Sequence, residues 1–247
     1  MKKLICMAAM FLAGAAAVFA LPDFGLSVGG GGILGGHFTR YSLEADGPAA
    51  RMSARQTMNQ FDYGVFAFFD ATFATLGITF QTGTNNFNES VYVDGTWNPD
   101  ESRSGQGWET VLGISLLGRW PFRLNDRLTV FPLLGMDYLI SLLQRRTDGY
   151  GLVYSRDDGL REGDKDGNAF SLSDWNSFIV RLGGGAEFDM TERFFLRGDL
   201  LFGIRLMTRY ERKNLDFMKD NSGDSSPNLG GLSFGPSVRL SAGWRLR

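Results

Sequence analysis

Ten charged residues lie at alternate positions within otherwise apolar segments of the chain. Successive side chains of a β-strand point to opposite faces of the sheet, so this spacing separates the charges from their apolar neighbours. If such strands close into a narrow barrel, the charges meet in its interior, where an unpaired charge is strongly destabilising. Arginine suits such pairing because its planar guanidinium forms two hydrogen bonds with a carboxylate. The ten residues of this expected lumen network are Asp62, Glu109, Arg119, Asp137, Arg181, Glu187, Arg197, Asp199, Arg205 and Arg239.

The lumen network has two possible roles. It is either a rigid plug or a gated path whose ion pairs exchange partners. A narrow barrel leaves no wide aqueous channel, which favours the plug. Four apolar residues are expected on the same inward face, and they suit either the passage of small hydrophobic solutes or ordinary packing, which we favour. These residues are Phe66, Phe131, Leu133 and Ile179.

His37 is the single histidine and therefore the first residue to weigh as a catalytic base. Hydrolytic or acyl-transfer chemistry requires a nucleophile within hydrogen-bond reach of that base. Ser27 and Thr39 share its expected strand face, but their spacing does not resemble that of lipid-modifying barrels. The sequence therefore predicts neither an enzyme nor a cofactor.

A candidate cation site begins at Asp164, where Asp166 and Asn168 follow at the spacing of the first three ligands of an EF-hand loop. The sequence then departs from that pattern. Ala169 stands where glycine is required, and Trp175 stands where the closing glutamate belongs. A solvated turn built from Asp, Asn and Gly is the favoured interpretation of this segment.

The first twenty residues have the organisation of a signal peptide. Lys2 and Lys3 precede an apolar run over 4–19, and Ala20 ends a small-residue cleavage pattern, so we expect a mature start at Leu21. A membrane anchor is the alternative, but the run is short for a spanning helix. The sequence therefore predicts export of residues 21–247.

Composition narrows the remaining choices. The only cysteine is Cys6, inside the expected signal peptide, so the mature chain has no disulfide and no thiolate metal site. A formal net charge of −2 argues against a basic surface for nucleic acid. Beyond the signal peptide the only lysines are Lys165, Lys213 and Lys219, all in polar, turn-like stretches.

The last segment shows the strand pattern most clearly, because apolar residues occupy every second position from Leu232 to Leu246. This alternation is far longer than the five or six residues of an ordinary strand, and it suits a tilted strand that crosses a membrane. Seven further segments with the same alternation are expected near 23–41, 60–70, 72–83, 108–120, 128–140, 178–188 and 194–206.

The connections between these segments alternate in length. Tight turns are expected around 70–71, 123–126 and 191–192, and long polar loops at about 42–57, 84–106, 147–173 and 213–230. Short turns at one end and long loops at the other are typical of outer-membrane barrels. The sequence thus predicts an all-β fold, an eight-stranded antiparallel up-and-down transmembrane β-barrel. A soluble lipocalin-type barrel, with its apolar face inward, is the alternative.

With these features the mature chain resembles the small eight-stranded outer-membrane barrels, the class that includes the OmpA transmembrane domain, OmpX and OmpW. The resemblance rests on pattern over the whole mature chain and on no diagnostic motif. It implies a monomer in the cell outer membrane, whose partners are outer-membrane lipid and the barrel-assembly machinery. The leading functional expectation is a narrow, OmpW-like channel for small or hydrophobic solutes. The alternative is a non-transporting adhesin or structural protein whose loops contact host surface molecules.

Overall fold

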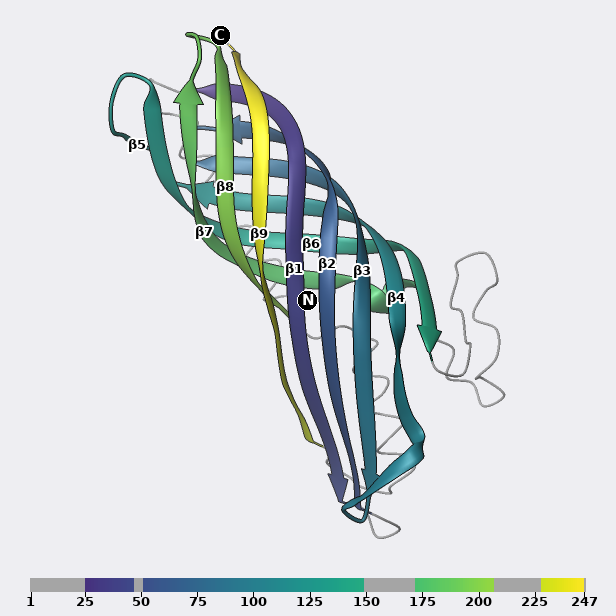
Figure 1. Cartoon of the computed structure of the whole chain (residues 1–247). Coiled ribbons are helices and arrows are strands. Elements are labelled where there is room, and N and C mark those ends of the chain that lie inside the picture. The colour runs from purple at the N-terminus through teal and green to yellow at the C-terminus, as the bar shows by residue number, and fades with distance from the viewer. Residues whose placement is uncertain (1–24, 47–50, 149–171, 207–227, 247) are drawn as a thin grey trace.

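Long antiparallel strands make up most of what the computed structural model describes, which is residues 25–46, 51–148, 172–206 and 228–246 (Figure 1). No helix within these ranges is long and apolar enough to cross a membrane. A two-residue strand, β5 (Phe122–Arg123), lies in the connection after β4, and a short 3-10 helix, η1 (Leu172–Trp175), precedes β7. The long strands are β1 (Leu26–Asp46), β2 (Arg51–Ala71), β3 (Ala74–Val93), β4 (Thr96–Arg119), β6 (Leu128–Asp148), β7 (Ser177–Asp189), β8 (Phe194–Arg205) and β9 (Asn228–Leu246).

The eight long strands form a closed ring. Their order is β4-β3-β2-β1-β9-β8-β7-β6, and a further pairing of β4 with β6 completes the circle. The first and last strands are neighbours, since Leu34 of β1 lies opposite both Tyr63 of β2 and Val238 of β9. This arrangement confirms the expected eight-stranded antiparallel up-and-down barrel.

The outer wall of the barrel carries an apolar belt. On β9 every outward position from Leu232 to Leu246 is apolar, and Leu240 is 65% exposed. On β1 and β2 the belt ends at Phe38 and Phe61, beyond which the outward residues are polar or charged. The inward positions hold the charges, so the soluble alternative with an apolar interior is wrong. A wall that is apolar outside and polar inside is the pattern of a transmembrane barrel.

The strands extend into two segments for which the sequence pattern predicts loops. β1 reaches Asp46 and β2 begins at Arg51, so most of 42–57 is strand rather than loop. Within 84–106, β3 and β4 form a hairpin closed by Asp94 and Gly95, whose φ angles are 50° and 78°. Two positive φ angles suit the tight turn that matches strand twist.

The reason for this difference is that the outward face becomes polar beyond the belt. Outward asparagines such as Asn86 and Asn88 are typical of loops, so the sequence pattern predicts a loop there. Phe87 and Val91 between and beyond them nevertheless point inward, as in a strand. The signal peptide over 1–20 and most of the predicted loops 147–173 and 213–230 lie outside the described residues.

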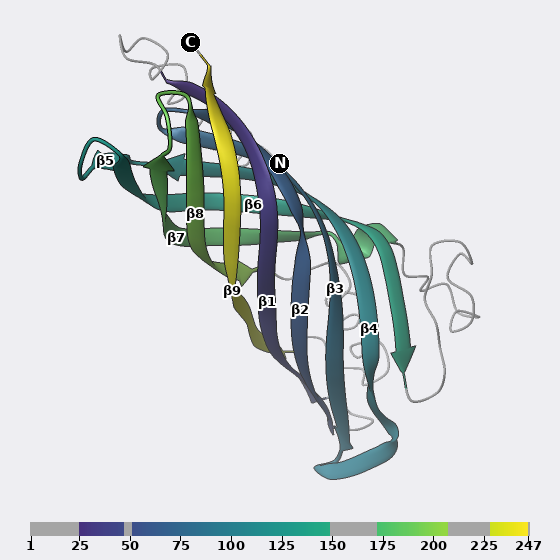
Figure 2. The same ribbon diagram turned by 45° about the horizontal axis from the view of Figure 1, so that its top comes forward.

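β1 to β4 extend past β6, β7 and β8 at the end away from the turns at 72–73 and 190–193, and β9 accompanies β1 as far as Glu44 (Figures 1 and 2). β4 pairs with β6 only from Gly105 onward, whereas its residues 96–104 are accompanied only by β3 within the described ranges. We call residues 40–46, 51–57, 88–93 and 96–104 the projecting sheet. Because short turns of such barrels lie on the periplasmic side, we expect the projecting sheet at the extracellular end and the turn after Asp70 at the periplasmic end.

Replacing Gly31 by alanine is expected to lower the free energy of unfolding by about 1–3 kcal/mol, the usual cost of overpacking. Its new Cβ would overlap the Leu240 carbonyl oxygen of the neighbouring strand. Gly32 is the matched control, because its Cβ would point outward and meet nothing closer than Gly64 O at 3.9 Å. Urea unfolding in lipid vesicles measures both variants, and equal stabilities would contradict the close packing of β1 against β9.

Candidate functional site

The largest ion-pair cluster fills the periplasmic half of the lumen and centres on Asp70, at the end of β2. One carboxylate oxygen of Asp70 accepts hydrogen bonds from Arg119 and Arg197, each with its Nη1 at 2.8 Å. The same Arg119 nitrogen lies 2.7 Å from Glu187, and Arg197 Nε lies 2.8 Å from Asp199. We call these five residues the Asp70 cluster. All five are buried, and each carboxylate has an arginine partner within the cluster.

Aromatic rings and glycines hold the arginines of this cluster in place. The guanidinium carbons of Arg119 and Arg197 lie 4.8 Å and 4.9 Å from the centroid of the Phe131 ring, within the range of a cation–π contact. Phe131 in turn needs space from β7, where a Cβ on Gly185 would overlap both its ring and Asp199. A glycine there is therefore a packing requirement of the Asp70 cluster.

A second group lies further along the lumen. Arg181 Nε donates to Asp137 at 2.8 Å, and Arg239 Nη2 donates to the same carboxylate oxygen at 3.2 Å. Ser115 accepts a weak hydrogen bond from Arg239 at 3.4 Å. Two arginines thus share one aspartate, which gives this level an excess of positive charge.

A third group, nearer the extracellular end, combines carboxylates with amides. Gln60 Nε2 donates to Asp62 at 2.7 Å and also to Glu109, and Gln144 Nε2 donates to Glu109 at 2.7 Å. His37 Nε2 lies 3.8 Å from Asp62. These acids receive amide hydrogen bonds rather than arginine partners among the described residues. They offset the positive excess of the Asp137 level.

Buried apolar side chains also face inward on the projecting sheet. Leu43 and Ala45 of β1 form a buried cluster with Ala54 of β2 and Val91 of β3. Ile179 and Leu201 are completely buried among further apolar residues deeper in the barrel. Charged, amide and buried apolar side chains thus face the described interior at several levels, and an eight-stranded barrel is only just wide enough for side chains to fill it.

All ten residues of the expected lumen network point into the barrel. Nine are buried, and Arg205 is partly exposed without an ion pair to another described residue. The sequence pattern does not predict Gln60, Asp70 and Gln144 in these groups, nor Arg245, whose Nη2 lies 3.8 Å from Glu187. The sequence pattern predicts a turn at Asp70. Asp70 is an even number of positions from Asp62 on β2, so both side chains point to the inward face. Gln144 follows a register shift in the pairing of β4 with β6, so the alternation along β6 does not reveal it.

The geometry offers no catalytic pair around His37. The Thr39 hydroxyl bonds to that of Ser233 at 2.7 Å instead, and His37 Nδ1 has no partner among the described residues. The candidate cation ligands Asp164, Asp166 and Asn168 lie outside the described ranges. Within those ranges no cluster of His, Cys, Asp and Glu has the geometry to hold a metal ion.

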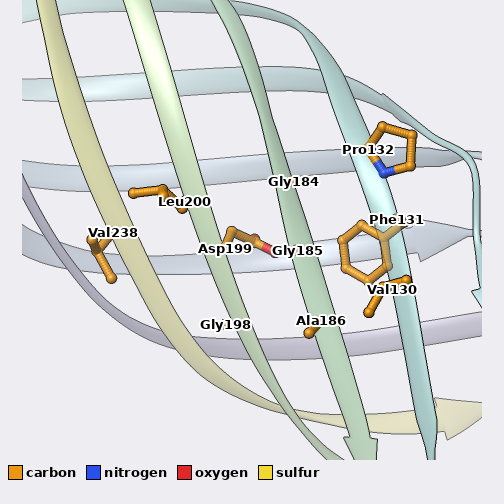
Figure 3. A pocket seen from close by; sticks show the side chains of 10 residues that line it. All are labelled: Val130, Phe131, Pro132, Gly184, Gly185, Ala186, Gly198, Asp199, Leu200 and Val238. Carbon is orange, nitrogen blue, oxygen red and sulfur yellow. The ribbon is translucent and has the colours of Figure 1, made fainter. Parts of the chain in front are cut away.

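Two hollows mark the outer wall. The first has a volume of about 550 Å³ and lies where Gly184 and Gly198 leave β7 and β8 without outward side chains, between Pro132 and Leu200 (Figure 3). A Cβ on Gly198 would meet only Leu240 Cδ2, at 3.5 Å, so packing does not demand glycine there. The second hollow lies on β9, β1, β2 and β3.

No protein-family model and no curated protein matches the chain. Among solved structures, it is similar to Ail, the attachment invasion locus protein of Yersinia pestis, in complex with the heparin analogue sucrose octasulfate. The identity is 12%, the TM-score is 0.31, and the match covers 90% of this chain and 99% of Ail. The translocator domain of the autotransporter NalP from Neisseria meningitidis matches at 14% identity and a TM-score of 0.30, over 99% of this chain and 98% of that domain.

A FadL homologue of Pseudomonas aeruginosa matches at 8% identity and a TM-score of 0.20, over 93% of this chain and 92% of that one. At these identities and TM-scores the likeness extends to neither a partner nor an activity. The assignment rests on the molecule itself. Its closed ring of eight strands, its apolar belt and its charge-filled lumen make this chain an outer-membrane β-barrel protein.

Proposed function

We propose that this barrel is a surface protein that does not conduct solutes and that binds a macromolecule outside the cell through the projecting sheet, as an adhesin does. The observation that carries this proposal is strand length. β1 to β4 contain 21, 21, 20 and 24 residues, whereas about 9–11 residues cross a bilayer. About half of each strand is therefore available outside the membrane.

The lumen supports the same function. A channel for small or hydrophobic solutes needs a continuous path, whereas buried ion pairs lie across the described interior of a barrel that is only just wide enough for side chains to fill. Opening a path would break several buried ion pairs together, and breaking one costs about 3–5 kcal/mol. These features favour a protein that binds at the cell surface over one that transports solutes.

The outer face of the projecting sheet has the chemistry of a binding surface. Arg40 and Arg55 stand beside polar residues, and the Arg55 guanidinium lies 5.9 Å from the Tyr92 ring centroid. Trp97, near the tip, is 55% exposed. Tryptophan, tyrosine and arginine are the residues that most often dominate binding energy at protein interfaces.

The test is a shortened hairpin. Asn88 lies opposite Ser104, so removing residues 89–93 and 96–103 while keeping the Asp94-Gly95 turn preserves the register. We expect cells displaying this variant to lose binding to host epithelial cells by roughly tenfold or more, as expected when interface hot spots are removed. Gly32→Ala is the control that leaves the projecting sheet intact. Full binding by the shortened variant, with urea stability unchanged, would remove the adhesin proposal.

A further inference from the structure

The second hollow of the outer wall lies at the extracellular border of the apolar belt. It is about 490 Å³ in volume and runs over Gly36, whose missing side chain leaves space between Phe61 of β2 and Pro236 of β9. Leu34 and Phe38 complete its apolar walls. This hollow opens sideways onto the belt, so hydrocarbon is the material that meets it in the membrane.

The rim of this second hollow, which we call the groove, becomes polar toward the outside of the cell. Asn59, Thr84 and Asn86 line that side with amides and a hydroxyl, which donate hydrogen bonds. On β1 the outward residue after Phe38 is Arg40, the first charge beyond the belt on that strand. Apolar walls and a polar, basic rim are therefore joined within a few residues.

Two arginines lie on neighbouring strands above the rim, Arg40 on β1 and Arg55 on β2, and the Arg55 guanidinium lies 5.9 Å from the Tyr92 ring centroid. Arg40 lies opposite Thr57, and Arg55 lies opposite Ser42, which makes the two arginines diagonal neighbours on the outer face. Diagonal positions of an antiparallel pair are roughly 7–8 Å apart. Neither arginine pairs with a carboxylate of the described residues, whereas Arg51 on the same face pairs with Asp46 at 3.0 Å.

We infer that this groove binds one outer-leaflet lipid whose phosphate lies close to its acyl chains. An acyl chain would lie over Gly36 between Phe38 and Phe61, and the phosphate would lie between Arg40 and Arg55. The planar guanidinium group of arginine forms paired hydrogen bonds with phosphate oxygens, and basic residues at a membrane surface attract anionic head groups. The site shares Arg40 and Arg55 with the outer face of the projecting sheet. The shortened hairpin keeps both arginines, so it tests the adhesin function separately from lipid binding.

The test titrates the full chain, refolded in neutral detergent, with dipalmitoyl phosphatidic acid and with dipalmitoyl glycerol, which lacks the phosphate. Native mass spectrometry counts the lipids held by each barrel. We expect one tightly held phosphatidic acid and weaker binding of the diacylglycerol. The double variant Arg40→Gln/Arg55→Gln should bind phosphatidic acid roughly tenfold more weakly or worse, given the attraction of two surface arginines. Thr84→Trp, which fills the groove, should weaken the binding of both lipids.

Two matched controls separate this site from general effects. Arg51→Gln removes one charge from the same face, and Gly198→Leu fills the first hollow, which has no arginine among its lining residues. Both controls should bind phosphatidic acid as the unmodified chain does. The inference is overturned if the double variant binds normally, or if Arg51→Gln weakens binding equally. It is also overturned if inorganic phosphate displaces the lipid, because the site would then take a free anion.

Discussion

Replacing Asp70 by asparagine is expected to lower the free energy of unfolding by about 3–5 kcal/mol, the usual cost of breaking a buried ion pair. The variant keeps the side-chain volume but removes the charge that two arginines share. Arg119 and Arg197 both lie 2.8 Å from one oxygen of Asp70, and Thr75 donates to its other oxygen at 2.5 Å. Glu187 and Asp199 would remain as partners, so the loss should stay within this range.

Urea unfolding of the barrel in lipid vesicles, followed by tryptophan fluorescence, measures this loss. The matched control is Asp46→Asn, which breaks the Arg51 pair at the edge of the projecting sheet. The side chains of that pair are 69% and 72% exposed, and exposed pairs contribute about 0–1 kcal/mol. Equal losses in the two variants would mean that the Asp70 cluster does not stabilise the lumen.

Leu240→Arg is expected to cause the second largest loss in the free energy of unfolding, after Asp70→Asn. Leu240 lies in the middle of the outward series of β9 and is 65% exposed to the barrel's surroundings. In water this exposure would make a charged residue harmless. At the midplane of a bilayer, however, an outward arginine costs about 2–4 kcal/mol.

The control for Leu240→Arg is Ser104→Arg, an exposed outward position on the projecting part of β4 that lies opposite Asn88. Surface substitutions away from special features usually change stability by less than about 0.5 kcal/mol. The same vesicle-based unfolding assay compares the two variants. A small effect of both would show that the belt does not contact lipid.

Much of this barrel could be predicted from the sequence, because strand parity is a local property. Alternation along 232–246 places Arg239 inside and Leu240 outside, and the structure has both where the pattern predicts them. Because the prediction depends on local alternation, the strands of the projecting sheet were predicted as loops. Beyond the belt the outward residues are polar, as loop residues are, and the alternation that marks a membrane strand fades.

The pairing inside the lumen could not be predicted, because it depends on how the ring closes. Asp70 and Arg197 are 127 positions apart in the chain, and they meet only because β2 and β8 face each other across the narrow interior. Parity shows which residues point inward but not which level each one occupies. The register shift before Gln144 moves that residue into the lumen in a way that no local pattern announces.

The most direct test of the closed lumen is electrical. The full chain, refolded and inserted into a planar lipid bilayer, should show no discrete conductance steps, because an eight-stranded barrel that holds these buried ion pairs leaves no wide aqueous channel. Protease protection of the belt region in parallel vesicles establishes that the barrel has inserted. Steady, reproducible single-channel steps from the inserted, unmodified chain would contradict a packed lumen and favour a transport function.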